Sequence, residues 1–258
     1  MEFDFLKLVK LSACLPLFSF VICVLLSIYK DFDQANTTHC GVYNIFPSIS
    51  ASIGGHLQPQ NAIWRMSIGL DSFIRYFISY IHYQKYYKIK QSHFKYTRIY
   101  FIFVKSMFGF NAIELASLML LSYVSSVEDF YLHQTGFILF ISASYIYMVM
   151  SLLTFYWPKK HIKLSFPFNV DEDDLRKQEL NAKKLKKNIF LIYNVALSLS
   201  FYFYVRHNTK CEPFVYSLFS LCEYVVVLTN IAFHMTIISD MSLLDTSYSI
   251  TIAELKKK

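Results

Sequence analysis

The chain alternates between long apolar runs and shorter polar segments. Six apolar runs stand out, at residues 11–29, 62–83, 99–127, 132–157, 188–205 and 213–238. Each is close to the ~20 residues with which an α-helix crosses the roughly 30 Å hydrocarbon core of a bilayer. The pattern therefore predicts an all-α fold, a polytopic six-helix transmembrane bundle that forms a single membrane domain over residues 1–258.

Two of the longer polar segments predict helices of their own. In residues 30–60, Pro47 stands before Ser48–Ile53, and Gly54 follows. Proline suits the first turn of a helix and glycine suits its end, so we expect a short interfacial helix that caps the bundle. Residues 158–187 place acidic residues before lysines, the charge order that favours a helix continuing into the fifth run.

Composition and charge agree with a membrane protein. Hydrophobic residues make up 55% of the chain and its mean hydropathy is +0.35, which is too apolar for an ordinary soluble domain. Nineteen of the 25 Lys and Arg residues lie in the N-terminal segment, the second and fourth connections and the C-terminal segment. The positive-inside rule places these segments, and so both termini, in the cytoplasm. The net charge of +7 thus reports topology, and nucleic acid is not an expected partner.

Two cysteines and a glycosylation sequence fall on the predicted lumenal side. Cys40 and Cys211 lie in the first and third lumenal loops, where an oxidising compartment permits disulfides. They form either a Cys40–Cys211 disulfide or two free thiols. Asn36 begins an Asn-Thr-Thr sequence, the acceptor pattern for N-glycosylation.

Ionisable residues inside the predicted spans are candidates for function, because each costs about 2.5–3.5 kcal/mol to insert. Asp71 and Arg75 are spaced to share one face of the second helix. Helix direction and depth place Asp71, Glu114 and Glu223 near the middle of the second, third and sixth spans, where they could converge. They form either a binding site or structural ion pairs between helices.

A second group of polar residues lies in the three lumenal loops. A histidine beside a carboxylate can remove a proton from a hydroxyl, and an adjacent arginine can hold a phosphate. The group comprises His39 and His56 in the first loop, Glu128, Asp129 and His133 in the second, and Arg206 and His207 in the third. No pair of these histidines has the spacing typical of zinc ligands, so no metal site is expected.

Ordered motifs in the lumenal segments and the last span carry a family resemblance. They are His39–Val42, Phe46–Ala51, Trp64–Arg65, Tyr123–Phe130, Arg206–Asn208 and Glu223–Tyr224. In this order they resemble the post-GPI attachment to proteins factor 2 family. That family is similar to the FRAG/DRAM/Sfk group and to the N-terminal region of the yeast Cwh43 protein. The likeness covers all six predicted spans.

The resemblance implies lipid remodelling of GPI anchors in the membrane of the Golgi, and also of the endoplasmic reticulum. The reaction would return a saturated fatty acyl chain to the sn-2 position of lyso-GPI. Acyl-CoA or a phospholipid would be the acyl donor, and no cofactor is needed. The implied partners are membrane lipids, GPI-anchored proteins and other GPI-remodelling enzymes.

For an acyl transfer of this kind, roles can be assigned to residues from their side-chain chemistry and their predicted depth in the membrane. His133 or His207 would act as the base on the sn-2 hydroxyl. Glu128 or Asp129 would orient that histidine. The predicted substrate-binding residues, with an arginine on the inositol phosphate, are Arg65, Arg206, His39, Asp71, Glu114 and Glu223.

Two other functions stay open from the sequence. A non-catalytic protein that presents lyso-GPI to a separate enzyme, or a sorting adaptor, would need a lipid groove but no acid–base pair. A small transporter is disfavoured, because no paired broken helices or inverted repeats are visible.

Overall fold

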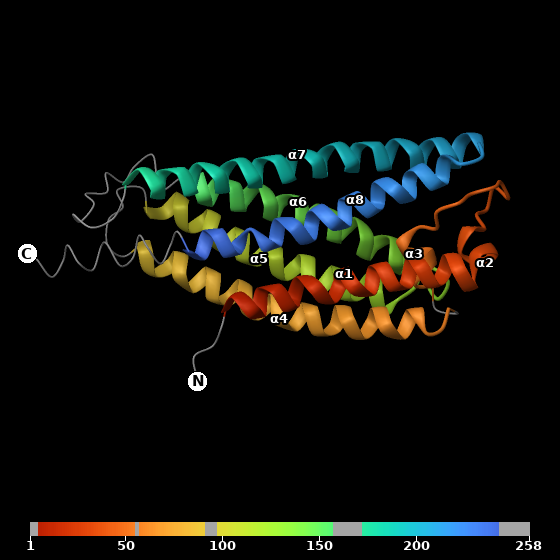
Figure 1. The fold of residues 1–258 in the computed structure, drawn as a ribbon, viewed down its shortest axis with the longest axis horizontal. Helices are drawn as coiled ribbons and strands as arrows, with labels where there is room; N and C mark the ends of the chain where they lie inside the picture. Colours follow the sequence, from red (N-terminus) through yellow and green to blue (C-terminus); the bar gives the residue numbers. More distant parts are fainter. Residues whose placement is uncertain (1–4, 55–56, 91–96, 157–171, 243–258) are drawn as a thin grey trace, which may run out of the picture.

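The computed structural model describes residues 5–54, 57–90, 97–156 and 172–242. Within these ranges the fold is all-α, with no strand. The helices are α1 Phe5–Lys30, α2 Phe32–Asn36, α3 Ile49–Ser52, α4 Gln60–Lys90, α5 Thr97–Tyr123, α6 Phe130–Tyr156, α7 Glu172–Lys210 and α8 Val215–Met235. The long helices lie side by side in an elongated bundle, with α2 and α3 at one end (Figure 1).

Five of the described helices, α1, α5, α6, α7 and α8, are long and apolar enough to cross a membrane. This identifies a membrane protein. The predicted second span forms α4, which is not among the five, because Arg65, Asp71 and Arg75 interrupt its apolar run. α4 nevertheless packs along both α1 and α5.

Some helix ends differ from the predicted runs. α5 ends at Tyr123, whereas the apolar run extends to Val127, because residues 124–129 form a turn in which Glu128 accepts a hydrogen bond from the Ser125 backbone N–H at 2.8 Å. α7 begins at Glu172, so the predicted continuation of the fifth span into the preceding segment is confirmed.

The bundle consists of two groups of helices. α1, α4, α5 and α6 pack in chain order, and α7 and α8 form a closely packed hairpin. Contacts between α6 and α7 are sparse compared with every neighbouring pair of long helices in either group. The two groups are therefore loosely packed against each other along α6 and α7.

The short helix α3 is buried among the long helices. Ile49 and Ile53 belong to a core cluster with Trp64, Leu118 and Phe140. The α3 end of the bundle, as named here, holds α2, α3, the turn at 124–129 and the turn at 211–214 (Figure 1).

Hydrogen bonds from neighbouring helices fix the backbone around α3. Ser48 is its N-cap and accepts from the Ala51 N–H, while Ser27 of α1 donates to the Ser52 carbonyl at 3.0 Å. Asn61 of α4 donates to the Ile53 carbonyl at 2.9 Å. α3 is thus held in place from two long helices.

Candidate functional site

A cavity of about 610 Å³ lies at the α3 end, between α3, α6, α7 and α8. Its apolar wall comes mainly from α6 and α7 and includes Phe137, Ile141 and Leu197. Its polar lining is Gln34, Thr37, Ser48, Ser50, Ser126, His133, Gln134, Ser142, Ser200, Tyr204, Tyr216 and Glu223. A long apolar wall with a polar end is the shape that suits a lipid.

The cavity opens sideways between α6 and α7. Ile138 of α6 and Phe201 of α7 both line it, yet their side chains are 57% and 69% exposed. Both residues lie within helices that can span the membrane, so this exposed surface faces lipid. A membrane-bound substrate can therefore reach the cavity without leaving the bilayer.

His133 lies at the polar end of the cavity with both ring nitrogens engaged. Nδ1 is 2.7 Å from the backbone carbonyl oxygen of Val124, and Nε2 is 2.9 Å from Ser50 Oγ. A carbonyl oxygen only accepts, so Nδ1 carries the proton, and Nε2 of the neutral ring is left as an acceptor. The Ser50 hydroxyl donates to it. Val124 thus fixes the tautomer in which His133 can act as a base.

Glu223 connects α8 to α3 beside this histidine. Its Oε2 accepts a hydrogen bond from the Ile49 backbone N–H at 2.9 Å, and its side chain is buried. Glu223 also lines a second hollow of about 60 Å³, which shares Ser50 and Phe137 with the main cavity. Glu223 thus binds the backbone of Ile49, the residue before Ser50. Its hydrogen bond is to α3, whereas the sequence suggested a contact with Asp71 and Glu114.

Glu128 and Asp129 have other partners than the His133 ring. Glu128 receives Arg65 Nη2 at 2.9 and 3.2 Å on its two oxygens. The Ser125 N–H, and then Arg65, hold the pKa of the Glu128 carboxyl below its usual range. Asp129 accepts from the Leu132 N–H at the start of α6. In this geometry the group that contacts His133 Nδ1 is the Val124 carbonyl.

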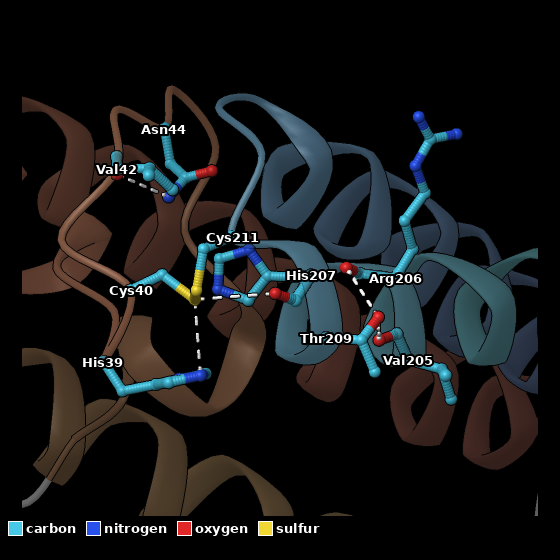
Figure 2. The surroundings of a disulfide bond; sticks show 9 residues. All are labelled: His39, Cys40, Val42, Asn44, Val205, Arg206, His207, Thr209 and Cys211. Carbon is cyan, nitrogen blue, oxygen red and sulfur yellow. Dashed lines mark hydrogen bonds between the residues drawn. A yellow bond between two sulfur atoms is a disulfide. The ribbon is translucent and has the colours of Figure 1, made fainter.

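The structure joins Cys40 and Cys211 in a disulfide with a Cα–Cα distance of 5.3 Å (Figure 2). It ties the loop after α2 to the turn between α7 and α8. The His207 ring lies beside the disulfide, and packs edge-on against His39 at 5.5 Å. His207 is buried and does not line the cavity, but its ring lies 4.9 Å from that of Tyr216, which does.

Arg206 and Asn36 both have protein partners in this structure. Arg206 points away from the disulfide (Figure 2) and donates to Glu212 at 2.7 Å. Asn36 is buried, and its amide nitrogen donates to the Phe32 carbonyl at 3.0 Å. The nitrogen that glycosylation would modify is therefore occupied in this conformation.

Asp71 and Glu114 meet in a buried network in the middle of the bundle. Arg75 Nη2 lies 2.8 Å from Glu114 Oε1, and Arg75 Nη1 lies 3.7 Å from Asp71. His234 Nε2 is 2.9 Å from the same Glu114 oxygen. Ser12 donates to Asp71 at 2.6 Å. Four long helices, α1, α4, α5 and α8, are cross-linked by this network.

Several functional candidates were invisible to sequence reasoning. Ser50 was one of three serines in the same short segment, with nothing to rank them. The Val124 carbonyl carries no side-chain signal. Lys186 of α7 and Asp240, which follows α8, form a buried ion pair that was also missed. Lys186 belongs to a lysine-rich stretch whose positive charge had been attributed to membrane topology.

Comparison with known proteins identifies the chain. The family model of the Frag1/DRAM/Sfk1/Cwh43P N-terminal domain matches residues 5–244. Post-GPI attachment to proteins factor 2 of Drosophila pseudoobscura pseudoobscura is 38% identical over 232 residues, or 90% of this chain and 84% of the relative. Acyltransferase PGAP2 of Xenopus tropicalis is 36% identical over 227 residues, or 87% and 82%. The chain belongs to the post-GPI attachment to proteins factor 2 family. No solved structure matches it.

The family resemblance and the cavity involve the same segments. Of the motifs that suggested the post-GPI attachment to proteins factor 2 family, Phe46–Ala51 contains Ser50 and enters α3. Tyr123–Phe130 contains Val124 and the turn before His133, and Glu223–Tyr224 contains the carboxylate that binds Ile49. In this member of the family, separate stretches of sequence therefore meet at one end of one cavity.

Proposed function

We propose that this protein is an acyltransferase that remodels GPI anchors by returning a saturated acyl chain to the sn-2 hydroxyl of lyso-GPI. The observation that carries the proposal is the cavity, open to lipid between α6 and α7, whose polar end presents the acceptor nitrogen of His133. The names of the relatives, post-GPI attachment to proteins factor 2 and acyltransferase PGAP2, support the same reaction class.

The chemistry needs a base at the depth of the lipid hydroxyl. The sn-2 hydroxyl would donate its proton to His133 Nε2 as its oxygen attacks the acyl carbonyl, and His133 would pass that proton to the leaving group. Phe137, Ile141 and Leu197 would hold the acyl chains. The polar part of the GPI anchor would extend beyond the α3 end.

Arg65 and Arg206 are the proposed contacts for the inositol phosphate. Both lie at the α3 end in partly exposed pairs with carboxylates, Glu128 and Glu212. Such pairs contribute only about 0–1 kcal/mol, so a phosphate can replace the carboxylate as partner at little cost. His39, Asp71 and Glu114, like the two arginines, do not line the cavity, and their proposed part in substrate binding rests on the sequence.

The proposed location is the Golgi membrane, and also the endoplasmic reticulum, with the α3 end in the lumen and both termini in the cytoplasm. The uneven distribution of Lys and Arg supports this orientation. A disulfide at the α3 end suits an oxidising lumen. GPI-anchored proteins present their lipid on that side, and they are the proposed substrates, with other remodelling enzymes as neighbours.

The deciding experiment is acyl transfer to a defined lyso-GPI by purified protein in nanodiscs, with acyl-CoA and phospholipid donors added singly. We expect His133→Ala to lower the rate by about 10²- to 10⁴-fold, the usual effect of removing a general base. His207→Ala, which alters a ring outside the cavity lining, is the matched comparison.

Absence of product from wild-type protein, with every donor, would overturn the enzymatic proposal if the same protein restores remodelling in deficient cells. The protein would then present lyso-GPI to a separate enzyme or act as a sorting adaptor.

A further inference from the structure

We propose that Ser50 is the nucleophile of this acyl transfer, and that it carries the acyl chain as an oxyester between donor and acceptor. The inference rests on the proposed function. Its basis is the contact between Ser50 Oγ and His133 Nε2, 2.9 Å apart at the lining of a lipid-accessible cavity. A hydroxyl bonded to a base, with the base oriented by a third group, is the arrangement of an activated nucleophile.

The tautomer of His133 supports this assignment. Because Nδ1–H donates to the Val124 carbonyl, in the Nδ1–H tautomer the Ser50 hydroxyl is the donor and Nε2 the acceptor. The proton of Ser50 therefore already points at the atom that would receive it. His133 itself is 6% exposed, so it is shielded from water, while Ser50 is partly accessible from the cavity.

The neighbouring serines show that this arrangement is specific to Ser50. The Ser48 hydroxyl oxygen accepts from the Ala51 N–H and the Tyr216 hydroxyl, as a helix cap. The Ser52 hydroxyl donates to the Ser48 carbonyl and is fully buried. Among Ser48, Ser50 and Ser52, Ser50 alone has its hydroxyl directed at a base. The other two serve the local backbone.

α3 is fixed on several sides, so Ser50 is held in a defined position. The preceding residue, Ile49, donates its N–H to Glu223 of α8, and the Tyr224 hydroxyl donates to the Pro47 carbonyl. Ser27 of α1 secures the other end through the Ser52 carbonyl. A reacting group held in advance avoids the entropic cost of bringing it into place.

The two half-reactions balance as follows. Ser50 Oγ attacks the carbonyl carbon of the acyl donor, His133 Nε2 takes the hydroxyl proton, and the bond to the donor's oxygen or sulfur breaks as His133 returns the proton to it. This leaves acyl-Ser50. The sn-2 hydroxyl of lyso-GPI then attacks acyl-Ser50, gives its proton to His133 Nε2, and displaces Ser50, which regains the proton.

The test is to trap the intermediate. Wild-type protein in nanodiscs is incubated with one donor and no lyso-GPI, and then digested for mass spectrometry. We expect the acyl mass on the peptide that contains Ser50, resistant to neutral hydroxylamine as an oxyester is, and discharged when lyso-GPI is added. His133→Ala should abolish the labelling. Label that neutral hydroxylamine removes would instead be a thioester on a cysteine and would overturn the inference.

Kinetics of substituted proteins give a second, independent readout. Ser50→Ala, His133→Ala and the double variant should lose transfer to the same extent, within a few fold, because a nucleophile and its base act as a unit. Ser50→Cys keeps a nucleophile and should form a hydroxylamine-sensitive acyl-enzyme. The control is Ser117→Ala, which removes a buried α5 hydroxyl that donates to the Ile113 carbonyl of its own helix, and should keep wild-type transfer.

The outcomes separate the inference from the proposed function. If Ser50→Ala keeps at least half of the wild-type rate while His133→Ala does not, direct transfer is correct and the inference on Ser50 is wrong. If wild-type protein neither forms product nor becomes labelled, the enzymatic function itself fails. Thermal unfolding of each variant, compared with wild type, excludes a folding defect as the cause.

Discussion

Two histidines in this protein have entirely different surroundings. His133 lies at the α3 end with neutral partners, a backbone carbonyl and a serine hydroxyl, at the wall of an open cavity. His234 lies in the middle of the bundle, 2.8 Å from Arg75 Nη2 and 2.9 Å from Glu114 Oε1, with Tyr147 stacked on its ring at 4.6 Å. The first histidine has neutral partners at the lining of a large cavity, and the second contacts a charged arginine and a carboxylate.

The difference separates a group poised for chemistry from one that joins helices. Around His234, Arg75 and Glu114 already contact each other and the ring, so a substrate would have to break a buried ion pair to react there. Around His133 the bond to Ser50 is a neutral hydrogen bond, worth about 0.5–1.5 kcal/mol, which a substrate hydroxyl can replace. Titratable residues in a membrane span therefore do not identify a site until their partners are known.

The strongest test of this contrast is Arg75→Ala in the central network. Removing one partner of a buried pair leaves Glu114 and Asp71 uncompensated, and costs about 3–5 kcal/mol. We expect a large loss of thermal stability in detergent, with activity per folded molecule close to wild type. A folded, stable Arg75→Ala protein without acyl transfer would contradict the structural role and make the network part of the site.

A second test narrows the lateral opening. Ile138→Trp adds bulk on the α6 side of the cavity, at a side chain that is 57% exposed and so has room for it. We expect unchanged unfolding temperature but about tenfold slower acyl transfer, equivalent to ~1.4 kcal/mol. Val195→Trp is the control, because Val195 is exposed on α7 but does not line the cavity. Equal effects of both substitutions would contradict entry between α6 and α7.

The smallest effect is expected at the edge of the site, from Glu128→Gln. The pKa of Glu128 is lower in the folded protein than in the unfolded chain. Its ionised form therefore stabilises the fold at pH values above the ordinary Glu pKa, near 4.3. This contribution is lost as the pH falls through the lowered pKa. For so exposed a pair we expect less than about 1 kcal/mol at pH 7. Stability of the variant and wild type should converge in acid. A 100-fold loss of transfer would instead restore Glu128 as the group that orients His133.

The sequence was sufficient for the fold because membrane helices leave strong signals. Length and hydropathy gave every long helix, and the serine-rich segment after Pro47 gave α3. The end of α5 was placed too late because Val127 is apolar, although it belongs to a turn. The spacing of Asp71 and Arg75 predicted their contact within α4, but the sequence could not reveal that Glu114 of α5 and Glu128 of the following turn complete the partners of the α4 arginines.

The site was predictable in part. His133 was a candidate because a histidine near a carboxylate is a recognisable pattern. Of the two partners found, the Val124 carbonyl carries no side-chain signal. Ser50 meets His133 because α3 enters the bundle, a tertiary event with no local signature. Asp71 and Glu114 do meet, but through Arg75 and His234 rather than with Glu223. The depth of a residue in the membrane can be predicted from its position along a helix. The direction in which its side chain points around the helix axis is much harder to predict from sequence.

α7, which forms one side of the opening, is fastened at two points along the bundle. The Cys40–Cys211 disulfide fastens the α7–α8 turn at the α3 end, and Lys186 of α7 donates to Ser151 of α6 at 3.1 Å near the other. A substrate that enters such a slot arrives by two-dimensional diffusion. The quantity that sets the rate is then the mole fraction of lyso-lipid in the bilayer, and diluting the membrane with inert lipid should slow turnover even when the amount of substrate per volume is unchanged.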